Sequence, residues 1–193
     1  MTELAGGPWL PTPQPEAVVD WARTHVAEFA STAIEPSDAF RGGQQAADAA
    51  LANFDVTGYA KDRNEVWPVQ RRGASRLSPY IRHGLLGLRR VWSHVAAGPA
   101  TDVTRFRDEL LWQEYARHLY ARVGEQTRRS LRYSVREQDA HPADPAVVWG
   151  GDGALCLAQS WTELREQGWL PNQSRMWLAS HWSVREGAAW RDG

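Results

Sequence analysis

Residues 103–123 read VTRFRDELLWQEYARHLYARV and carry the clearest helical signal in the chain. Apolar side chains recur there in four-residue steps, at Leu111, Tyr115, Leu119 and Val123. This is the spacing of side chains on one face of an α-helix. Thr101 or Asp102 stands where an N-cap is expected. The pattern therefore predicts a long helix over about 103–123 that buries this stripe in the core.

The flanking sequence is also helical in character. Apolar spacing, together with proline and glycine positions, predicts helices that begin at Pro15-Glu16 and Ser78-Pro79 and others over about 44–54, 88–97, 155–167 and 173–185. Residues 57–77 lack periodicity and are expected to form a long ordered loop, a kind of loop that is often functional. The sequence shows no strand-like alternation and no glycine-rich dinucleotide fingerprint.

The predicted fold class is therefore all-α, arranged as an orthogonal helical cluster. We expect an N-terminal lead-in and helix over residues 1–41, followed by the main domain over residues 42–193.

Composition excludes several classes of protein. The chain has 193 residues, of which 42% are hydrophobic and 23% charged, as expected for one globular domain. It contains no apolar run of membrane-spanning length and no signal-peptide pattern, so we expect a cytoplasmic protein without membrane association. Cys156 is the only cysteine, and the six histidines lack metal-ligand spacing. We therefore expect no disulfide and no metal site.

Arginines concentrate in one part of the sequence. Residues 63–98 contain seven arginines, and Glu65 is the only acid among them. Such a stretch can face a phosphate, a dinucleotide or DNA. It can also be a solvated face that the acidic residues of segment 1–55 balance, and charge alone favours this second interpretation.

The stretch Gly73-Ala74-Ser75-Arg76-Leu77-Ser78-Pro79-Tyr80-Ile81 is the most informative for function. Two serine hydroxyls, free backbone N–H groups and neighbouring arginines meet at a predicted helix start, and together they form an anion site. Ordinary capping by Ser78 is the simpler explanation for this motif when it is taken alone.

Further motifs stand before and after that stretch in a fixed order. They are Tyr59–Asn64 (YAKDRN), Glu109–Tyr115 (ELLWQEY), Gly168–Met176 (GWLPNQSRM) and Trp190–Gly193 (WRDG). In this order and at these spacings, the series resembles the FAD-binding domain of DNA photolyases and cryptochromes. The resemblance covers about residues 42–193.

The resemblance implies FAD as cofactor and a role for each matching residue. It implies that Tyr59 and Arg175 contact the flavin cofactor and that Ser75, Leu77 and Ser78 bind its pyrophosphate. It further implies that Glu109, Trp112 and Asn172 line the cavity over the flavin, and that Trp190 belongs to a tryptophan relay. Glu109 and Trp112 are three residues apart, so they share one helix face that differs from the apolar stripe.

The implied function is light-driven electron transfer to damaged DNA, or light or redox sensing. The sequence also departs from the family pattern. About forty residues precede the resemblance, too few for the family's antenna domain, and the chain stops before the last part of the flavin pocket. Gln113 and Gln173 replace family arginines that would meet DNA. Three alternatives follow: FAD binds weakly, a second chain completes the flavin pocket, or the chain is a degenerate, non-catalytic helical interaction module that has lost FAD.

Overall fold

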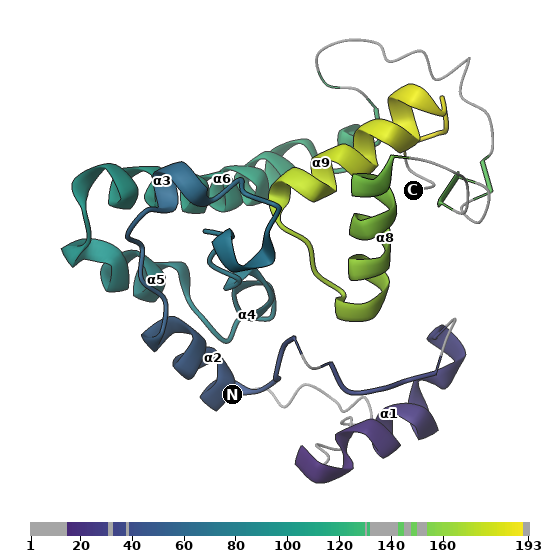
Figure 1. Ribbon diagram of the computed structural model, residues 1–193, viewed down its shortest axis with the longest axis horizontal. Coiled ribbons are helices and arrows are strands. Elements are labelled where there is room, and N and C mark those ends of the chain that lie inside the picture. The colour runs from purple at the N-terminus through teal and green to yellow at the C-terminus, as the bar shows by residue number, and fades with distance from the viewer. Residues whose placement is uncertain are drawn as a thin grey trace. The chain divides into compact units, whose positions relative to one another are not determined.

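The structure is a computed structural model that describes residues 15–30, 33–37, 39–129, 131, 143–144, 148–149 and 154–190. The chain divides into two compact units, residues 1–40 and residues 41–193, which we call unit 1 and unit 2. Among the described residues, every secondary-structure element longer than one residue is a helix, which confirms the predicted all-α class (Figure 1). No described helix is both long enough and apolar enough to cross a bilayer.

Unit 1 consists of η1 (Pro15–Ala17), α1 (Val18–His25) and η2 (Ala27–Phe29). The helix predicted from Pro15-Glu16 is present. Within the unit, Arg23 donates to the Ile34 carbonyl at 3.1 Å and pairs with Asp20. None of the described side chains of these three elements is buried, so the described part of this unit forms no buried core.

Unit 2 holds the remaining described elements. In chain order these are α2 (Gln44–Ala52), α3 (Tyr59–Asp62), η3 (Val69–Arg71), α4 (Ser78–Arg82), α5 (Leu88–His94), η4 (Val95–Ala97), α6 (Ala100–Val123), η5 (Gly124–Arg128), α8 (Leu155–Gln167), α9 (Asn172–Ser180) and η7 (His181–Arg185). The expected helices are found with boundaries shifted by a few residues. The expectation of an irregular loop over 57–77 is wrong in part, because this segment contains the short helical elements α3 and η3.

Asp102 explains why a helical turn forms at α3. The prediction that Thr101 or Asp102 caps its own helix is wrong, because α6 begins one turn earlier, after Pro99. The Asp102 carboxylate instead accepts hydrogen bonds from the backbone N–H groups of Gly58 at 3.0 Å and Ala60 at 2.8 Å. It thus caps α3 from another helix, a long-range contact that local sequence patterns do not reveal.

The first half of α6 forms the centre of unit 2. Val103, Phe106 and Leu110 are buried, and the Phe106 ring lies 5.0 Å from that of Phe54 and 4.9 Å from that of Tyr59. This aromatic cluster joins α6 to α3 and to the end of α2. The core therefore uses the i, i+3, i+7 positions of the helix.

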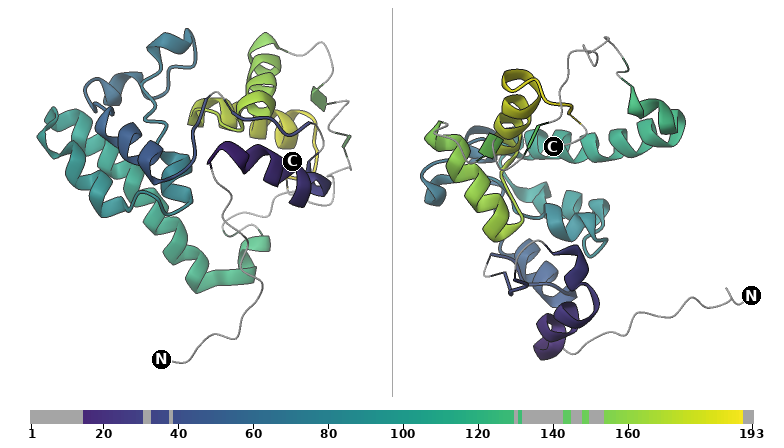
Figure 2. Two further views of the ribbon diagram at one scale, coloured as in Figure 1. Left: turned by 90° about the horizontal axis from the view of Figure 1, so that it is seen from below. Right: turned by 90° about the vertical axis from the view of Figure 1, so that its right-hand side faces the viewer.

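The predicted core stripe on the second half of α6 is wrong. Leu111 is 52% exposed and Tyr115 56% exposed, while Leu119 and Val123 are only half-buried. The physical reason is rotation about the helix axis. Tyr115 follows the buried Phe106 by nine residues, which is about 900° of turn and places it on the opposite side. The second half of α6 extends past α4 and α5 in both views of Figure 2.

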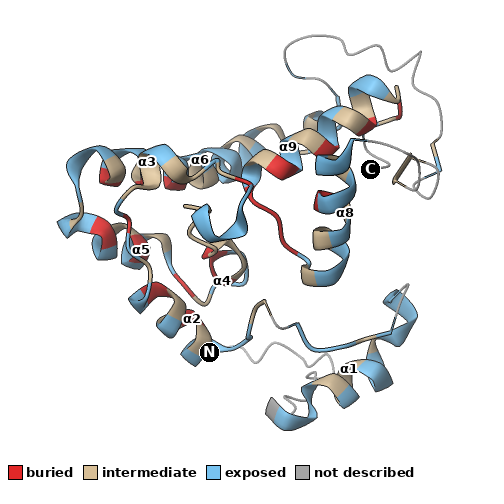
Figure 3. Ribbon diagram, in the orientation of Figure 1, coloured by how far each residue is buried: buried red, intermediate tan, exposed pale blue. Residues whose placement is uncertain are grey.

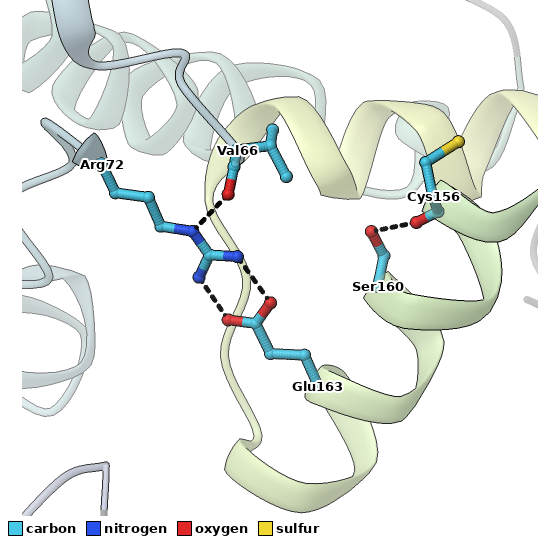
Figure 4. A network of polar contacts seen from close by, with 5 residues as sticks. All are labelled: Val66, Arg72, Cys156, Ser160 and Glu163. Carbon is cyan, nitrogen blue, oxygen red and sulfur yellow. Dashed lines mark hydrogen bonds and ion pairs between the residues drawn. The ribbon is translucent and has the colours of Figure 1, made fainter. Parts of the chain in front are cut away.

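The helices α8 and α9 meet at a steep angle and are joined by a buried connector (Figure 1). Trp169, Leu170 and Pro171 form this connector, drawn as the red segment between the two helices in Figure 3. A bidentate ion pair attaches α8 to the segment before α4. Arg72 contacts the two Glu163 oxygens at 2.5 and 2.8 Å and donates to the Val66 carbonyl at 2.8 Å (Figure 4).

Candidate functional site

One cavity in unit 2 gathers side chains from most of the elements just described. Its volume is about 940 Å³, which is at the upper end of the range of small-molecule sites. The walls come from α3, the segment 74–76, α4, one side of α6, the connector after α8, and the start of α9. The cavity is therefore built by residues that are far apart in the sequence.

The charge of the lining is strongly positive. Among the described lining residues, Glu109 is the only acid, and it faces five arginines and one histidine. The basic residues are Arg63, Arg76, Arg82, His83, Arg117 and Arg175. Guanidinium groups bind phosphate oxygens in bidentate fashion. The cavity is thus suited to an anionic ligand with more than one phosphate oxygen.

Six of the nine site residues predicted from the sequence line this cavity. They are Tyr59, Ser75, Ser78, Glu109, Asn172 and Arg175. More than a hundred residues of sequence separate the first of these six residues from the last, and the fold brings all six together. The other three, Leu77, Trp112 and Trp190, are not among the lining residues.

Each of those three has a different surrounding. Leu77 is 1% exposed and belongs to the core beneath the start of α4. Trp112 is 63% exposed and lies edge-on to Tyr115, with ring centroids 5.6 Å apart. Trp190 is 50% exposed. Glu109 and Trp112 thus do not share the cavity face, and the roles of Leu77, Trp112 and Trp190 stay predictions.

The serine-rich entrance is held in an arrangement different from ordinary capping. No side chain caps α4, and the Ser78 hydroxyl accepts a hydrogen bond of 3.1 Å from the Trp169 indole N–H. The Ser75 hydroxyl accepts one from the Leu77 amide at 3.4 Å. Ser78 therefore links the α4 start to the connector between α8 and α9.

Arg76 lies between these two serines in an unusual conformation. It has φ of 57°, and it is the only non-glycine residue with positive φ among those described. Its guanidinium carbon lies 5.1 Å from the centre of the Trp169 ring, in cation–π geometry. A positive φ costs a non-glycine residue about 1–2 kcal/mol. The contact with Trp169 offsets part of this cost and holds a cation at the cavity wall.

Tyr59, Arg63 and Glu109 form the acid-bearing part of the lining. The Arg63 guanidinium lies 3.5 Å from a Glu109 oxygen and also donates to the Ala60 carbonyl. Burial, assisted by the negative charge of Glu109 and opposed by Arg63, raises the pKa of Tyr59 to about 12. The Tyr59 phenol therefore stays neutral near pH 7 and keeps its proton as a hydrogen-bond donor.

Sequence reasoning missed several lining residues whose signals were present. Arg63, Arg76 and Trp169 stand inside the quoted motifs but received no site role. Arg117 and Tyr120 extend the face of α6 that begins at Glu109 and Gln113. Their spacing of three and four residues places them on one side of the helix.

Comparison with known proteins agrees with the resemblance predicted from the sequence. No protein-family model matches the chain. It is 29% identical over 126 residues to a deoxyribodipyrimidine photo-lyase of Alkalihalophilus pseudofirmus, covering 63% of this chain and 26% of the relative. It is 26% identical over 173 residues to the enzyme of that name from Synechococcus, covering 83% of this chain and 34% of the relative.

A solved structure supports the fold independently. A bacterial class III photolyase from Agrobacterium tumefaciens superposes with a TM-score of 0.68 at 24% identity, covering 81% of this chain and 34% of that one. The molecule is thus an all-α domain of the photolyase type. The resemblance predicted from the sequence is confirmed for photolyases: the chain is similar to them in sequence and in fold, and it spans a quarter to a third of the relatives' length.

Proposed function

We propose that unit 2 binds FAD in the cavity described above. The observation that carries this proposal is the convergence of six residues, each expected from the resemblance to face FAD or the cavity over it, in one basic pocket of about 940 Å³. The residue types fit the cofactor. Five arginines oppose one carboxylate in the lining, and a dinucleotide brings two phosphate charges that need such partners.

Different residues would bind different parts of the cofactor, according to their chemistry. Ser75, Ser78 and the backbone at Leu77 would hold the pyrophosphate. Because α4 has only five residues, its dipole adds little, and neighbouring arginines such as Arg76 and Arg82 supply most of the charge. Tyr59, kept as a neutral phenol, would donate a hydrogen bond within the same pocket.

FAD, when bound, supplies a light-absorbing redox centre. Glu109 and Asn172 would then orient a second ligand, since a carboxylate and an amide can read the edge of an extruded base. The relatives are named as photo-lyases, and we propose the same light-driven chemistry on damaged DNA for this chain. Trp112 lies outside the cavity, exposed beside Tyr115, and would contact the same DNA from there, while Trp190 would relay electrons.

Spectroscopy with added cofactor tests the FAD proposal. Purified protein should retain FAD through gel filtration and show a flavin spectrum with resolved fine structure. Riboflavin, which lacks phosphates, should bind at least about tenfold more weakly, because the arginine contacts are lost. Arg175→Ala and Arg82→Ala should weaken FAD binding, whereas Arg89→Ala, an exposed arginine outside the lining, should leave it unchanged.

Colourless protein that ignores added FAD would instead support the interaction module as the function. If FAD binds, repair of pyrimidine dimers in an oligonucleotide under blue light tests the second part of the proposal. Glu109→Gln should then slow repair while FAD stays bound, and equal repair by this variant would contradict the assigned role.

A further inference from the structure

The second half of α6 carries an apolar face that the described residues of unit 2 leave uncovered. Leu111, Tyr115, Leu119 and Val123 recur in four-residue steps, and we call these four residues the α6 stripe. Leu111 and Tyr115 are more than half exposed, and no described residue buries Leu119 or Val123 fully. Each step drifts by only about 40° around the axis, so the four side chains form one continuous strip.

This strip is distinct from the other two faces of the same helix. The core face carries Val103, Phe106 and Leu110, and the cavity face carries Glu109, Gln113, Ala116, Arg117 and Tyr120. A partner on the α6 stripe would therefore leave the cavity face as it is. An uncovered strip of this kind on a protruding helix marks an interaction surface.

The charges beside the stripe identify the partner. Asp108 and Arg122 are both exposed and lie seven residues before and seven residues after Tyr115. Seven residues are nearly two full turns, so both charges lie within about 20° of the Tyr115 direction. Three residues of the stripe, Leu111, Tyr115 and Leu119, are thus centred on Tyr115, with an acid beyond one end and a base beyond the other.

A second copy of the chain satisfies this pattern. When two such helices pack antiparallel about a twofold axis at Tyr115, each Asp108 faces the Arg122 of the other copy. Leu111 of one copy likewise falls opposite Leu119 of the other. Parallel packing would instead place Asp108 against Asp108 and Arg122 against Arg122. Like charges facing each other oppose association, so the arrangement favours the antiparallel pair.

We propose that the chain forms a twofold-symmetric dimer through the α6 stripe, with Asp108 and Arg122 fixing its direction and register. A twofold interface uses the same patch on both copies, as this one does. The stripe spans about 18 Å, twelve residues at 1.5 Å each, so the dimer is small and reversible. The stripe lies outside the cavity proposed for FAD, and it meets the proposed function only at Tyr115, whose ring contacts Trp112.

Charge reversal provides the test. By sedimentation equilibrium the unmodified chain should show a concentration-dependent dimer. Asp108→Arg and Arg122→Asp should each raise the dissociation constant by about tenfold or more, because both then place like charges face to face. The double variant should dimerise again. An equimolar mixture of the two single variants should form heterodimers, since every facing pair is then opposite in sign.

The control is Glu166→Arg, which makes the same change of charge at an exposed position on α8. It should leave association unchanged. A chain that is monomeric at all concentrations, or oligomers that ignore the charge reversals, would overturn the proposal. Tyr115→Glu adds a second check, because it places two carboxylates together on the twofold axis and should abolish the dimer. FAD binding measured on the same samples separates this outcome from the proposed function.

Discussion

The Trp169 indole donates a hydrogen bond of 3.1 Å to the Ser78 hydroxyl, across 91 positions of sequence. Trp169 is only 7% exposed, so its N–H has little access to water. The bond fixes the start of α4 against the connector that leads to Asn172 and Arg175. It therefore fixes two walls of the cavity, α4 and the connector, relative to each other. Ser78 thus both lines the cavity and stabilises its structure.

Removing the Ser78 hydroxyl should weaken the attachment of α4 to the connector and lower the stability of the fold. Ser78→Ala removes the hydroxyl that accepts this hydrogen bond from the Trp169 indole, and the loss of such a bond costs about 0.5–1.5 kcal/mol of unfolding free energy. Ser75→Ala removes only a long 3.4 Å bond to the Leu77 amide and should cost clearly less. Urea unfolding of both variants checks this order, and equal losses would contradict the role assigned to the Trp169 contact.

Gly73 should tolerate no side chain. Its amide donates to the Asp62 carbonyl at 3.0 Å, and an added Cβ would lie 2.7 Å from the Asp62 carbonyl carbon and 2.9 Å from the Arg63 nitrogen. Because both are backbone atoms, they cannot swing aside, and Gly73→Ala should cost about 1–3 kcal/mol. Gly42→Ala meets no atom within 4 Å and is the matched control in thermal denaturation.

Local patterns in the sequence predicted the helices well because each one depends on its own spacing and breakers. The same patterns misplaced the core of α6. The stripe at Leu111 and Tyr115 has perfect helical spacing, yet the core uses Phe106 and Leu110 on another face. Periodicity shows that a face is apolar, and only the tertiary arrangement decides what covers it.

The candidate site likewise contains residues that could be predicted from the sequence and contacts that could not. Residues inside short motifs, such as Tyr59 and Asn172, could be assigned from the sequence and do line one cavity. The supporting contacts could not be assigned. Asp102 caps α3 from α6, and Glu163 holds Arg72 across 91 positions. Such pairs carry no local signal, because their partners are set by the fold.

Asp102 should be essential for the position of Tyr59. Its two carboxylate oxygens accept from the Gly58 and Ala60 amides. Asp102→Ala removes both acceptors and should cost about 1–2 kcal/mol, while Asp102→Asn keeps one acceptor and should lose about half as much. Chemical denaturation measures the order, and an Asn variant as weak as the Ala variant would show that charge matters more than acceptor count.

Tyr59 should titrate later than an exposed tyrosine. Its pKa in the folded chain is about 12, against about 10 in the unfolded chain. Between these values the unfolded state loses the proton while the folded state keeps it, so stability falls as pH rises from 10 to 12. Below pH 10 this contribution is constant. Tyrosinate absorbance should show a late-titrating group that Tyr59→Phe removes, and Glu109→Gln should lower the pKa of this group.

The pair between Arg72 and Glu163 should show the behaviour of a buried ion pair. Its side chains are only 6% and 12% exposed, so removing one partner leaves a charge in a poorly hydrated place, which costs about 3–5 kcal/mol. Glu163→Leu and Arg72→Met should each approach this loss. The double variant Arg72→Met/Glu163→Leu leaves no charge behind and should recover much of the stability. Glu125→Gln breaks the Arg128 pair, whose side chains are 75% and 84% exposed, and should cost no more than about 1 kcal/mol. Losses that simply add in the double variant would show that the two side chains stabilise the fold independently of each other.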